Sequence, residues 1–476
     1  MKKIIVFGLL LVIACGGNRL DLARTALLLG NYSEADHALR GVKESDRNRA
    51  DFHELAALLE VAVNNIPAAE AEAAAAAKLE PRNKSLQLNL AELDVHFGNK
   101  KLVDAAKKSL EDLSADPAYR RDALRQLAVA ALRDGDFAHA EALSQKLQLE
   151  KPLALEDQLL NLTILKKGMS TNFDQALVSL EKQVGDNPQQ VNALSGWLVG
   201  QSMTAEALQW LLGLPAKMRQ EQAVVVALSD CYAARQNWPD ITSLLADLKW
   251  GDSDFLRLAL LSRALREQKD DLAAQANWQK AVTLASGRRQ PLCALLRLAN
   301  AWGWDKEKEA VAWTVVERYP SEHWALQLLD RFYTANDNTR GLQKVYATLM
   351  KNDASDVMAK NNFAAVSLLL GLRLPEAHVI AKEIYDRFPQ DAIIVSTYAY
   401  SLHVQGRTQE GLQLLAKLPE DKLHLPAVAT YYGVLLAAAG QPDKAKPYLD
   451  IARASKLLPE EKALVTAAQP ASPSPK

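Results

Sequence analysis

The sequence predicts an all-α fold built from repeated helical hairpins. Prolines and glycines recur at intervals near 35 residues, and both residue types mark helix ends, because proline cannot continue a helix and glycine can adopt the left-handed backbone that ends one. No stretch alternates apolar and polar residues between turn residues, as a half-buried strand would. The recurring prolines are Pro81, Pro117, Pro152, Pro188, Pro320 and Pro389. The recurring glycines are Gly30, Gly98, Gly135, Gly371, Gly406 and Gly440.

The clearest unit spans residues 121–154, where two segments with helical periodicity flank a short turn. Gly135 can end the first helix, and Asp136 is suited to cap the start of the second. Ala140 is small enough for the two helices to approach closely, and Pro152 ends the second helix. One such pair cannot bury its own apolar residues, so it must stack on copies of itself. The apolar residues of the first helix are Leu124, Leu127, Ala128 and Ala131.

This unit resembles the tetratricopeptide repeat, a helix–turn–helix of 34 residues. The resemblance implies an α-solenoid, a right-handed superhelix of stacked hairpins that binds other proteins in a groove lined by the first helix of each repeat. The family places a small residue in the second helix, twelve positions before the proline. Residues that match this position are Ala69, Ala105, Ala140, Ala176 and Ala377.

Reading outward from these positions gives thirteen units and a terminal half-helix at residues 460–468. We expect N-terminal repeats over residues 20–190, irregular tryptophan-rich repeats over 191–320, and C-terminal repeats with their cap over 321–468. Residues 469–476, QPASPSPK, are polar and proline-rich and are expected to be disordered. The expected units are 20–42, 50–83, 84–117, 121–154, 157–190, 191–214, 222–250, 255–285, 291–320, 322–353, 357–389, 392–419 and 426–459.

The first residues predict export and a lipid anchor. Two lysines precede an apolar run of eleven residues, 4–14, which is typical of a signal peptide and too short to span a bilayer. The run ends in Val12-Ile13-Ala14-Cys15, which resembles the lipobox of bacterial lipoproteins. The resemblance implies cleavage after residue 14, acylation of Cys15 in a short N-terminal segment, 15–19, and an outer-membrane anchor facing the periplasm in a cell with two membranes. An ordinary signal peptide with an incidental cysteine is the alternative.

Composition and motifs argue against catalysis and nucleic-acid binding. The 56 basic and 57 acidic residues give a net charge of −1, which provides no basic field for nucleic acid. The sequence contains no zinc-type histidine pair, no phosphate-binding glycine loop and no nucleophile elbow. We therefore expect no catalytic residues, no metal site and no cofactor.

Candidate partner-binding residues come from the tryptophans and from the expected groove. All nine tryptophans lie between residues 197 and 324. Most are expected in the core, but Trp302 and Trp304 fit no repeat position well, so an aromatic surface for a protein or a glycan is the alternative. Asn361 and Asn362 resemble the asparagines of repeats that clamp peptide carboxylates, although the basic residues of that clamp are out of register. The candidate groove residues are His323, Arg331, Asn361, Asn362, Tyr400 and His403.

These observations predict a non-enzymatic, lipid-anchored scaffold of the cell envelope that binds a protein partner. A solenoid exposes a long surface for its mass, and a lipid anchor would confine the search for partners to the membrane plane. Two alternatives stay open. One is an accessory lipoprotein for export or assembly of exopolysaccharide or surface protein, and the other is an envelope enzyme or enzyme activator.

Overall fold

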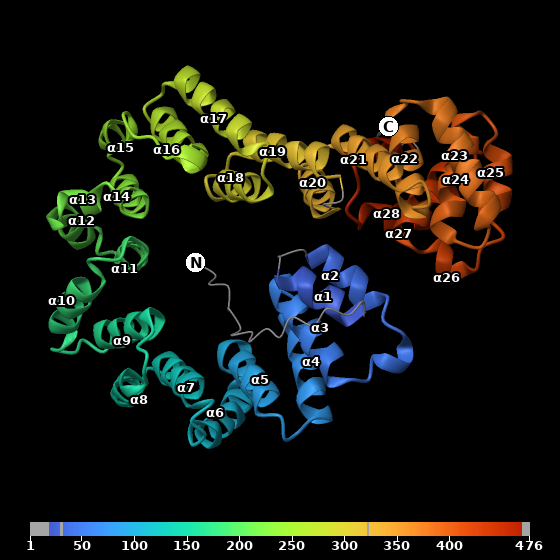
Figure 1. Cartoon of the computed structure of the whole chain (residues 1–476). Helices are drawn as coiled ribbons and strands as arrows, with labels where there is room; N and C mark the ends of the chain where they lie inside the picture. The colour runs from blue at the N-terminus through green and yellow to red at the C-terminus, as the bar shows by residue number, and fades with distance from the viewer. Residues whose placement is uncertain (1–18, 29–31, 321–322, 469–476) are drawn as a thin grey trace, which may run out of the picture. The chain divides into compact units, whose positions relative to one another are not determined.

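The computed structural model describes residues 19–28, 32–320 and 323–468, apart from the side chains of residues 33, 34 and 323. Within these ranges the chain forms α-helices and short 3-10 helices and no β-strand, and the helices follow one another as antiparallel pairs (Figure 1). The prediction of an all-α solenoid is confirmed. Cys15, the expected signal peptide and the expected disordered tail lie outside the described residues.

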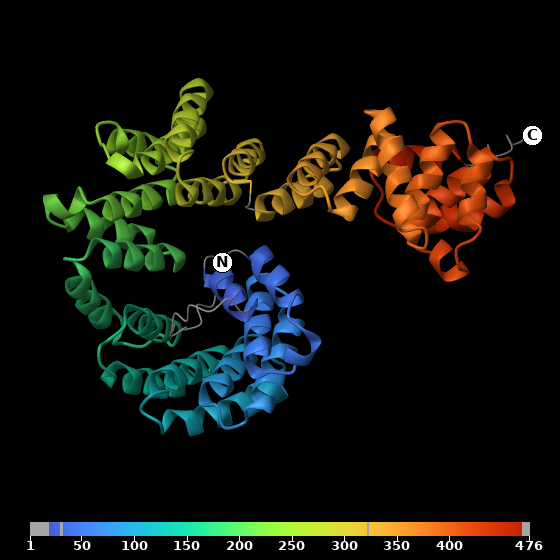
Figure 2. The same cartoon turned by 45° about the vertical axis from the view of Figure 1, so that its right-hand side comes forward.

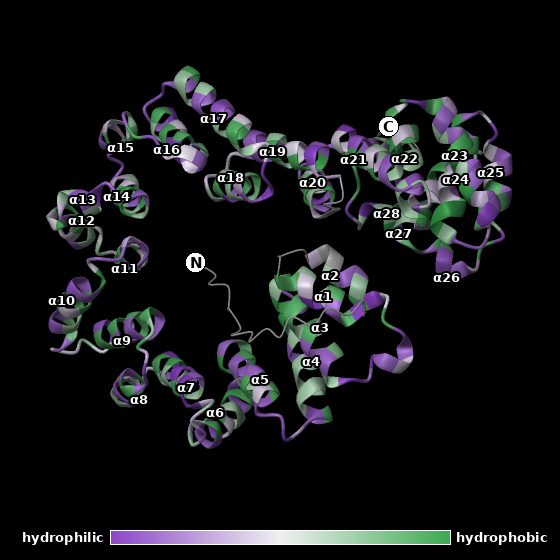
Figure 3. Ribbon diagram, viewed as in Figure 1, coloured by the Kyte–Doolittle hydropathy of each residue, from purple (hydrophilic) through white to green (hydrophobic). Residues whose placement is uncertain are grey.

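Contacts divide the chain into two compact units, Met1–Leu295 and Leu296–Lys476. The division falls within α18 (Arg289–Ala301), so it coincides with neither boundary expected from the sequence, 190/191 or 320/321. In each unit a hairpin packs mainly against the next hairpin along the chain. Most labelled helices carry both hydrophilic and hydrophobic residues (Figure 3), as expected where one side of a helix is buried.

The first unit contains eight helix pairs before α18. The pairs are α1 (Arg19–Leu28) and α2 (Tyr32–Arg40), α3 (Ala50–Ala62) and α4 (Ile66–Leu79), α5 (Lys84–Phe97) and α6 (Lys100–Ser114), α7 (Arg120–Asp134) and α8 (Phe137–Leu149), α9 (Leu155–Lys167) and α10 (Phe173–Val184), α11 (Pro188–Gly200) and α12 (Thr204–Gly213), α14 (Gln222–Ala234) and α15 (Trp238–Leu245), and α16 (Asp254–Glu267) and α17 (Asp271–Ala285). Shorter helices are η1 (Glu44–Asp46), α13 (Ala216–Arg219) and η2 (Gly251–Ser253).

The second unit begins within α18, whose partner in the chain is α19 (Asp305–Arg318), and ends in a single helix. Four further pairs follow: α20 (His323–Ala335) and α21 (Thr339–Asn352), α22 (Val357–Leu370) and α23 (Leu374–Arg387), α24 (Ala392–Val404) and α25 (Thr408–Leu415), and α27 (Pro426–Ala438) and α28 (Pro442–Arg453). The remaining helices are α26 (Glu420–Leu423) and α29 (Pro459–Ala467). Helices α22–α28 lie close together in both views (Figures 1 and 2).

The hairpin read most clearly from the sequence forms as expected. Gly135 ends α7 in the left-handed conformation with φ 77°, and the Asp136 side chain accepts a hydrogen bond from the backbone N–H of His139 at the start of α8. Ala140 is fully buried between the helices. α8 ends at Leu149, so Pro152 follows its last turn.

Two positions differ from the sequence expectation. Ala105 is exposed and Ala106 is buried, because this repeat has one residue fewer than the template between the buried alanine and the proline: 11 positions separate Ala106 from Pro117, and 12 separate Ala140 from Pro152. Ala106 lies 34 residues before Ala140, which is the true register of this repeat. Pro188 does not end a helix but begins α11, where the Asn187 side chain caps the first turn, so the expected boundary at 190/191 falls inside a helix.

A residue with positive φ recurs in the turn between the two helices of the hairpins. From Gly135 onward, successive members are 33 to 35 residues apart. Five of the eleven members are glycines, and the other six leave no glycine signal in the sequence. Gly98, which the sequence placed at such a turn, has φ −64° instead. A non-glycine residue in this conformation costs about 1–2 kcal/mol. The series is Asn64, Gly135, Met169, Ser202, Gln236, Lys269, Gly303, Asp337, Gly371, Gly406 and Gly440.

Replacing Met169 by glycine should stabilise the α9–α10 hairpin by about 0.5–1 kcal/mol, since the relief of backbone strain exceeds the entropy that glycine adds to the unfolded chain. The Met169 side chain is 89% exposed, so little packing is lost. Hydrogen exchange of the α9 and α10 amides measures the change. The control is Met358→Gly in α22, where the backbone is helical and the same replacement should give no stabilisation.

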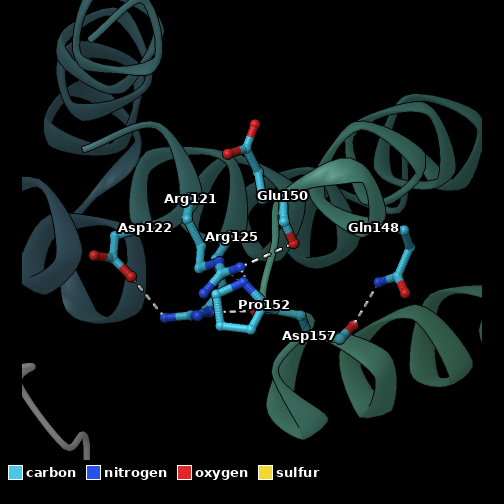
Figure 4. Close-up of polar contacts among 7 residues, drawn as sticks. All are labelled: Arg121, Asp122, Arg125, Gln148, Glu150, Pro152 and Asp157. Carbon is cyan, nitrogen blue, oxygen red and sulfur yellow. Dashed lines mark hydrogen bonds and ion pairs between the residues drawn. The ribbon is translucent and has the colours of Figure 1, made fainter. Parts of the chain in front are cut away.

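A buried carboxylate joins two consecutive hairpins of the first unit (Figure 4). The Asp157 side chain on α9 is fully buried, and its Oδ1 accepts a hydrogen bond from Arg125 Nε on α7 at 2.6 Å. Arg121 Nε lies 3.7 Å from the other carboxylate oxygen. Arg125 also pairs with Asp122 at 2.8 Å, but that carboxylate is half exposed.

The same arginines hold the connection between α8 and α9. Arg121 donates to the backbone carbonyl oxygen of Glu150 at 2.9 Å and to that of Pro152. The Gln148 side chain donates to the backbone carbonyl of Asp157 at 3.2 Å. Three helices therefore meet at one charged cluster, which fixes the second hairpin against the first.

Candidate binding cavity

A cavity of about 340 Å³ opens in the second unit between the first helices of two successive hairpins. α20 and α22 form its sides, and α21 supplies the remaining lining residues. Two of the residues expected in a partner-binding groove, Arg331 and Asn362, line it. The full lining is Leu326, Gln327, Asp330, Arg331, Tyr346, Leu349 and Asn362.

Polar groups of fixed orientation meet at this cavity. The Tyr346 hydroxyl donates to the Asp330 carboxylate, and burial together with this bond raises the pKa of the tyrosine far above its usual range. Asp330 Oδ1 is buried and has no hydrogen-bond partner. Asn361 is 2% exposed, and its side-chain nitrogen donates to the Asn362 side-chain oxygen at 3.4 Å. Asn361 therefore does not line the cavity itself, but its hydrogen bond orients the Asn362 amide, which does.

The cavity combines a cation, amides and apolar side chains. Arg331 is exposed and offers several donors, Asn362 and Gln327 bear amides, and Leu326 and Leu349 add apolar surface. Its volume is within the range of sites that hold a small ligand or a few side chains of a peptide. The arrangement suits recognition of a peptide segment that presents hydrogen-bond acceptors and an apolar side chain, and it offers no nucleophile activated by a base.

A buried aromatic network fixes α20 against its neighbours. Trp313 of α19 donates its indole N–H to the Tyr333 hydroxyl at 2.8 Å, and that hydroxyl donates to the Glu309 carboxylate at 2.5 Å. Burial, followed by the bond to Glu309, raises the pKa of Tyr333 to about 12. Gly341 of α21 packs directly on the Tyr333 ring, since a Cβ there would lie 2.3 Å from a ring carbon. This contact sets the position of α20, which bears Asp330 and Arg331.

The tryptophans expected at a surface are mostly packed. Trp304 is 8% exposed, and its ring centre lies 4.9 Å from that of the half-buried Trp302, in an edge-to-face arrangement. Trp304 is therefore largely buried, and the two indole rings pack against each other.

Tyr400 and His403, two other candidate groove residues, do not line the cavity. Tyr400 is 5% exposed and stacks on Tyr431 with ring centres 4.7 Å apart, so it belongs to a core and does not line an open groove. His403 is half-buried, its Nδ1 lies 3.0 Å from the Thr408 hydroxyl, and burial lowers its pKa. His323 is the first residue of α20, and its side chain lies outside the described residues.

The sequence did not reveal the contribution of the second helix. Tyr346 and Leu349 of α21 line the cavity, whereas the resemblance places the groove on first helices. Asp330, the neighbour of Arg331, also lines it without being predicted. The spacing of Gln327 and Arg331, four residues apart on one helix face, was the available signal for these neighbours.

A second polar cluster lies in the first unit, between α5 and α7. Glu92 of α5 lies beside Gln126 of α7, and burial, followed by the nearby charge of Asp122, raises the pKa of Glu92 to about 7. His96 lies beside the same Gln126 side chain, and burial lowers the pKa of that histidine. These are polar groups buried at the contact between two helices.

Replacing Glu92 by glutamine should stabilise the first unit at pH 8 by about 2 kcal/mol and have little effect at pH 4. The folded chain keeps the proton up to about pH 7, whereas the unfolded chain loses it near its ordinary pKa of 4.5. The wild-type contribution is therefore complete below pH 4.5 and is lost as the pH rises through 7. Hydrogen exchange of α5 and α7 at both pH values measures the effect, with the exposed Glu111→Gln as control.

Within the described residues, the placement of metal-ligating side chains and the length and polarity of the helices bear on function. No group of three or more histidine, cysteine, aspartate or glutamate residues is arranged to hold a metal ion in this part of the chain. Among the same residues, no helix is both long enough and apolar enough to cross a bilayer.

No protein family model and no curated protein sequence matches this chain. Similar solved structures include a tetratricopeptide repeat protein from Parabacteroides merdae, with 15% identity, coverage of 59% of this chain and 98% of that chain, and a TM-score of 0.28. The Naa15/Naa10 complex with HypK-THB matches at 15% identity over 95% of this chain and 78% of that chain, with a TM-score of 0.26. The APC/C hetero-tetramer Cut9–Hcn1 matches at 11% identity over 94% and 96%, with a TM-score of 0.28. Because these values are low, the fold assignment rests on the helices themselves.

Proposed function

We propose that this chain is a non-enzymatic, lipid-anchored scaffold of the cell envelope, and that it binds a protein partner at the cavity between α20 and α22. The observation that carries the partner site is the convergence of Arg331, Asn362, Tyr346 and Asp330 on that cavity. The lipobox-like sequence ending at Cys15 supports the anchor.

The partner site is tested by crosslinking in living cells. A photoreactive amino acid at position 331 or 362 should capture one defined envelope protein. The same amino acid at Lys382, an exposed residue of α23 outside the cavity, should not. Equal capture from all three positions would contradict a site at the cavity. Recovery of a polysaccharide synthase or an outer-membrane barrel would assign the scaffold to an export machine.

The anchor is tested separately by Cys15→Ser. The variant should leave the membrane fraction and accumulate in the soluble envelope fraction, since an acylated cysteine supplies the proposed attachment. A variant that stays in the membrane to the same extent as the wild type would contradict lipid anchoring, whatever the crosslinking result.

A further inference from the structure

The last helix packs on surfaces far away in the sequence. α29 contacts α22 as well as its neighbours α27 and α28. Val465 is 2% exposed, and Leu464 packs against the same apolar cluster, which also contains Tyr400 and Tyr431. α29 therefore lies across several hairpins of the second unit, rather than only continuing the last one.

Two consecutive glutamates in the first turn of α29 meet hydroxyl donors. The Thr339 hydroxyl, at the start of α21, donates to the Glu460 carboxylate across 121 residues of sequence. The Tyr431 hydroxyl of α27 donates to Glu461 at 3.1 Å. On the same helix, Lys462 Nζ lies 3.4 Å from Asp337 in the α20–α21 turn. Each charged side chain of α29 named here therefore faces a group of complementary chemistry: a hydroxyl donor for each glutamate and a carboxylate for the lysine.

Part of the surface beneath α29 is formed by contacts between other helices. Tyr431 of α27 is stacked on Tyr400 of α24, with ring centres 4.7 Å apart. Thr339 is the first residue of α21. The hydroxyls of Thr339 and Tyr431 offer two donors to the adjacent carboxylates of α29.

The attachment of α29 rests on few buried contacts. It has nine residues, fewer than the roughly 12–15 needed for a stable isolated helix, so its structure depends on docking. Val465 is its one fully buried side chain among the described residues. The Lys462–Asp337 pair is exposed on both sides, and such pairs contribute at most about 1 kcal/mol.

We propose that the surface formed by Asp337, Thr339, Tyr431 and the apolar residues beneath Val465 is a docking site for an amphipathic helix with two adjacent carboxylates in its first turn. α29 occupies this docking site within the chain. A partner protein's helix of the same pattern binds there when α29 opens. This inference is independent of the lipid anchor and of the α20–α22 cavity.

The test uses the full chain and a fluorescent synthetic peptide of residues 457–468. Val465→Asp places a charge at the buried contact and should release α29. The matched control, Ala463→Asp, places the same charge on the exposed side of the same helix. The peptide should bind the Val465→Asp variant at least about tenfold more tightly than the control or the wild type, because it no longer competes with α29.

A second peptide tests the chemistry of recognition. Changing both glutamates to glutamine, Glu460→Gln with Glu461→Gln, should weaken binding to the Val465→Asp variant about tenfold, since the amide oxygens still accept the two hydrogen bonds but without the charge that strengthens them. Equal binding of the two peptides would overturn the proposed recognition. Absence of binding to a Val465→Asp variant whose other helices remain folded would overturn the docking site.

Hydrogen exchange on the wild type tests the proposal without a variant. Amides of α29 should exchange about 100-fold faster than those of α27, because a weakly docked helix opens without global unfolding. Equal protection of α29 and α27 would show that α29 is a permanent part of the core, and the proposal would then fail even if Val465→Asp prevented folding.

Discussion

Replacing Asp157 by asparagine is expected to destabilise the junction of the α7–α8 and α9–α10 hairpins by about 3 kcal/mol. Asparagine keeps the size of the side chain but removes its charge, so Arg125 and Arg121 lose the carboxylate they share. Removing one partner of a buried ion pair costs more than the pair itself contributes, because the remaining charge is left in an environment that solvates it poorly.

Local exchange is the appropriate measurement, because a repeat protein need not unfold in one step. Amides of α7 to α10 should exchange about 100-fold faster in Asp157→Asn. Asp122→Asn is the matched control, since it removes a carboxylate from the same Arg125 on the exposed side, and its expected cost is below about 1 kcal/mol. Similar losses of protection in both variants would mean that burial does not increase the contribution of the Asp157 carboxylate to stability.

The fold could be predicted because residues with known backbone preferences stand at many of the helix ends and turns. Gly135 and Asp136 end one helix and begin the next with residues whose local preferences agree with the structure. At Met169 and Lys269 the backbone makes the same turn with residues that do not favour it. Packing of the flanking helices imposes the left-handed conformation there, and no local signal in the sequence reports it.

The candidate site was predicted in part, for a similar reason. Arg331 and Asn362 lie on first helices, so their place at a groove lined by first helices could be expected. Tyr400 has the same position in its repeat as Arg331, six residues before the positive-φ residue of the turn, yet it stacks on Tyr431 in the core. Its burial comes from a cluster that also contains Tyr431, on the first helix of the next hairpin, and a repeat pattern read one unit at a time does not report such a contact.

Replacing Gly341 by alanine is expected to destabilise the second unit by about 2 kcal/mol. This is the opposite of the effect that helix propensity alone predicts for glycine to alanine. Gly341 lies in α21, where alanine would ordinarily add up to about 1 kcal/mol of stability. The added Cβ would fall 2.3 Å from the ring of Tyr333. That ring is held by its bonds to Trp313 and Glu309, so it cannot move without leaving two buried polar groups unpaired.

Gly196→Ala is the matched control, because Gly196 lies within α11 and its added Cβ would meet nothing within 4 Å. Thermal unfolding should show opposite signs, with stabilisation at position 196 and loss at position 341. In a Tyr333→Leu background the cost of Gly341→Ala should fall to below about 1 kcal/mol, since the clash is with the aromatic ring. A cost that persists in that background would place the strain in the backbone of α21 and would remove Tyr333 as the residue that positions α20 beside the cavity.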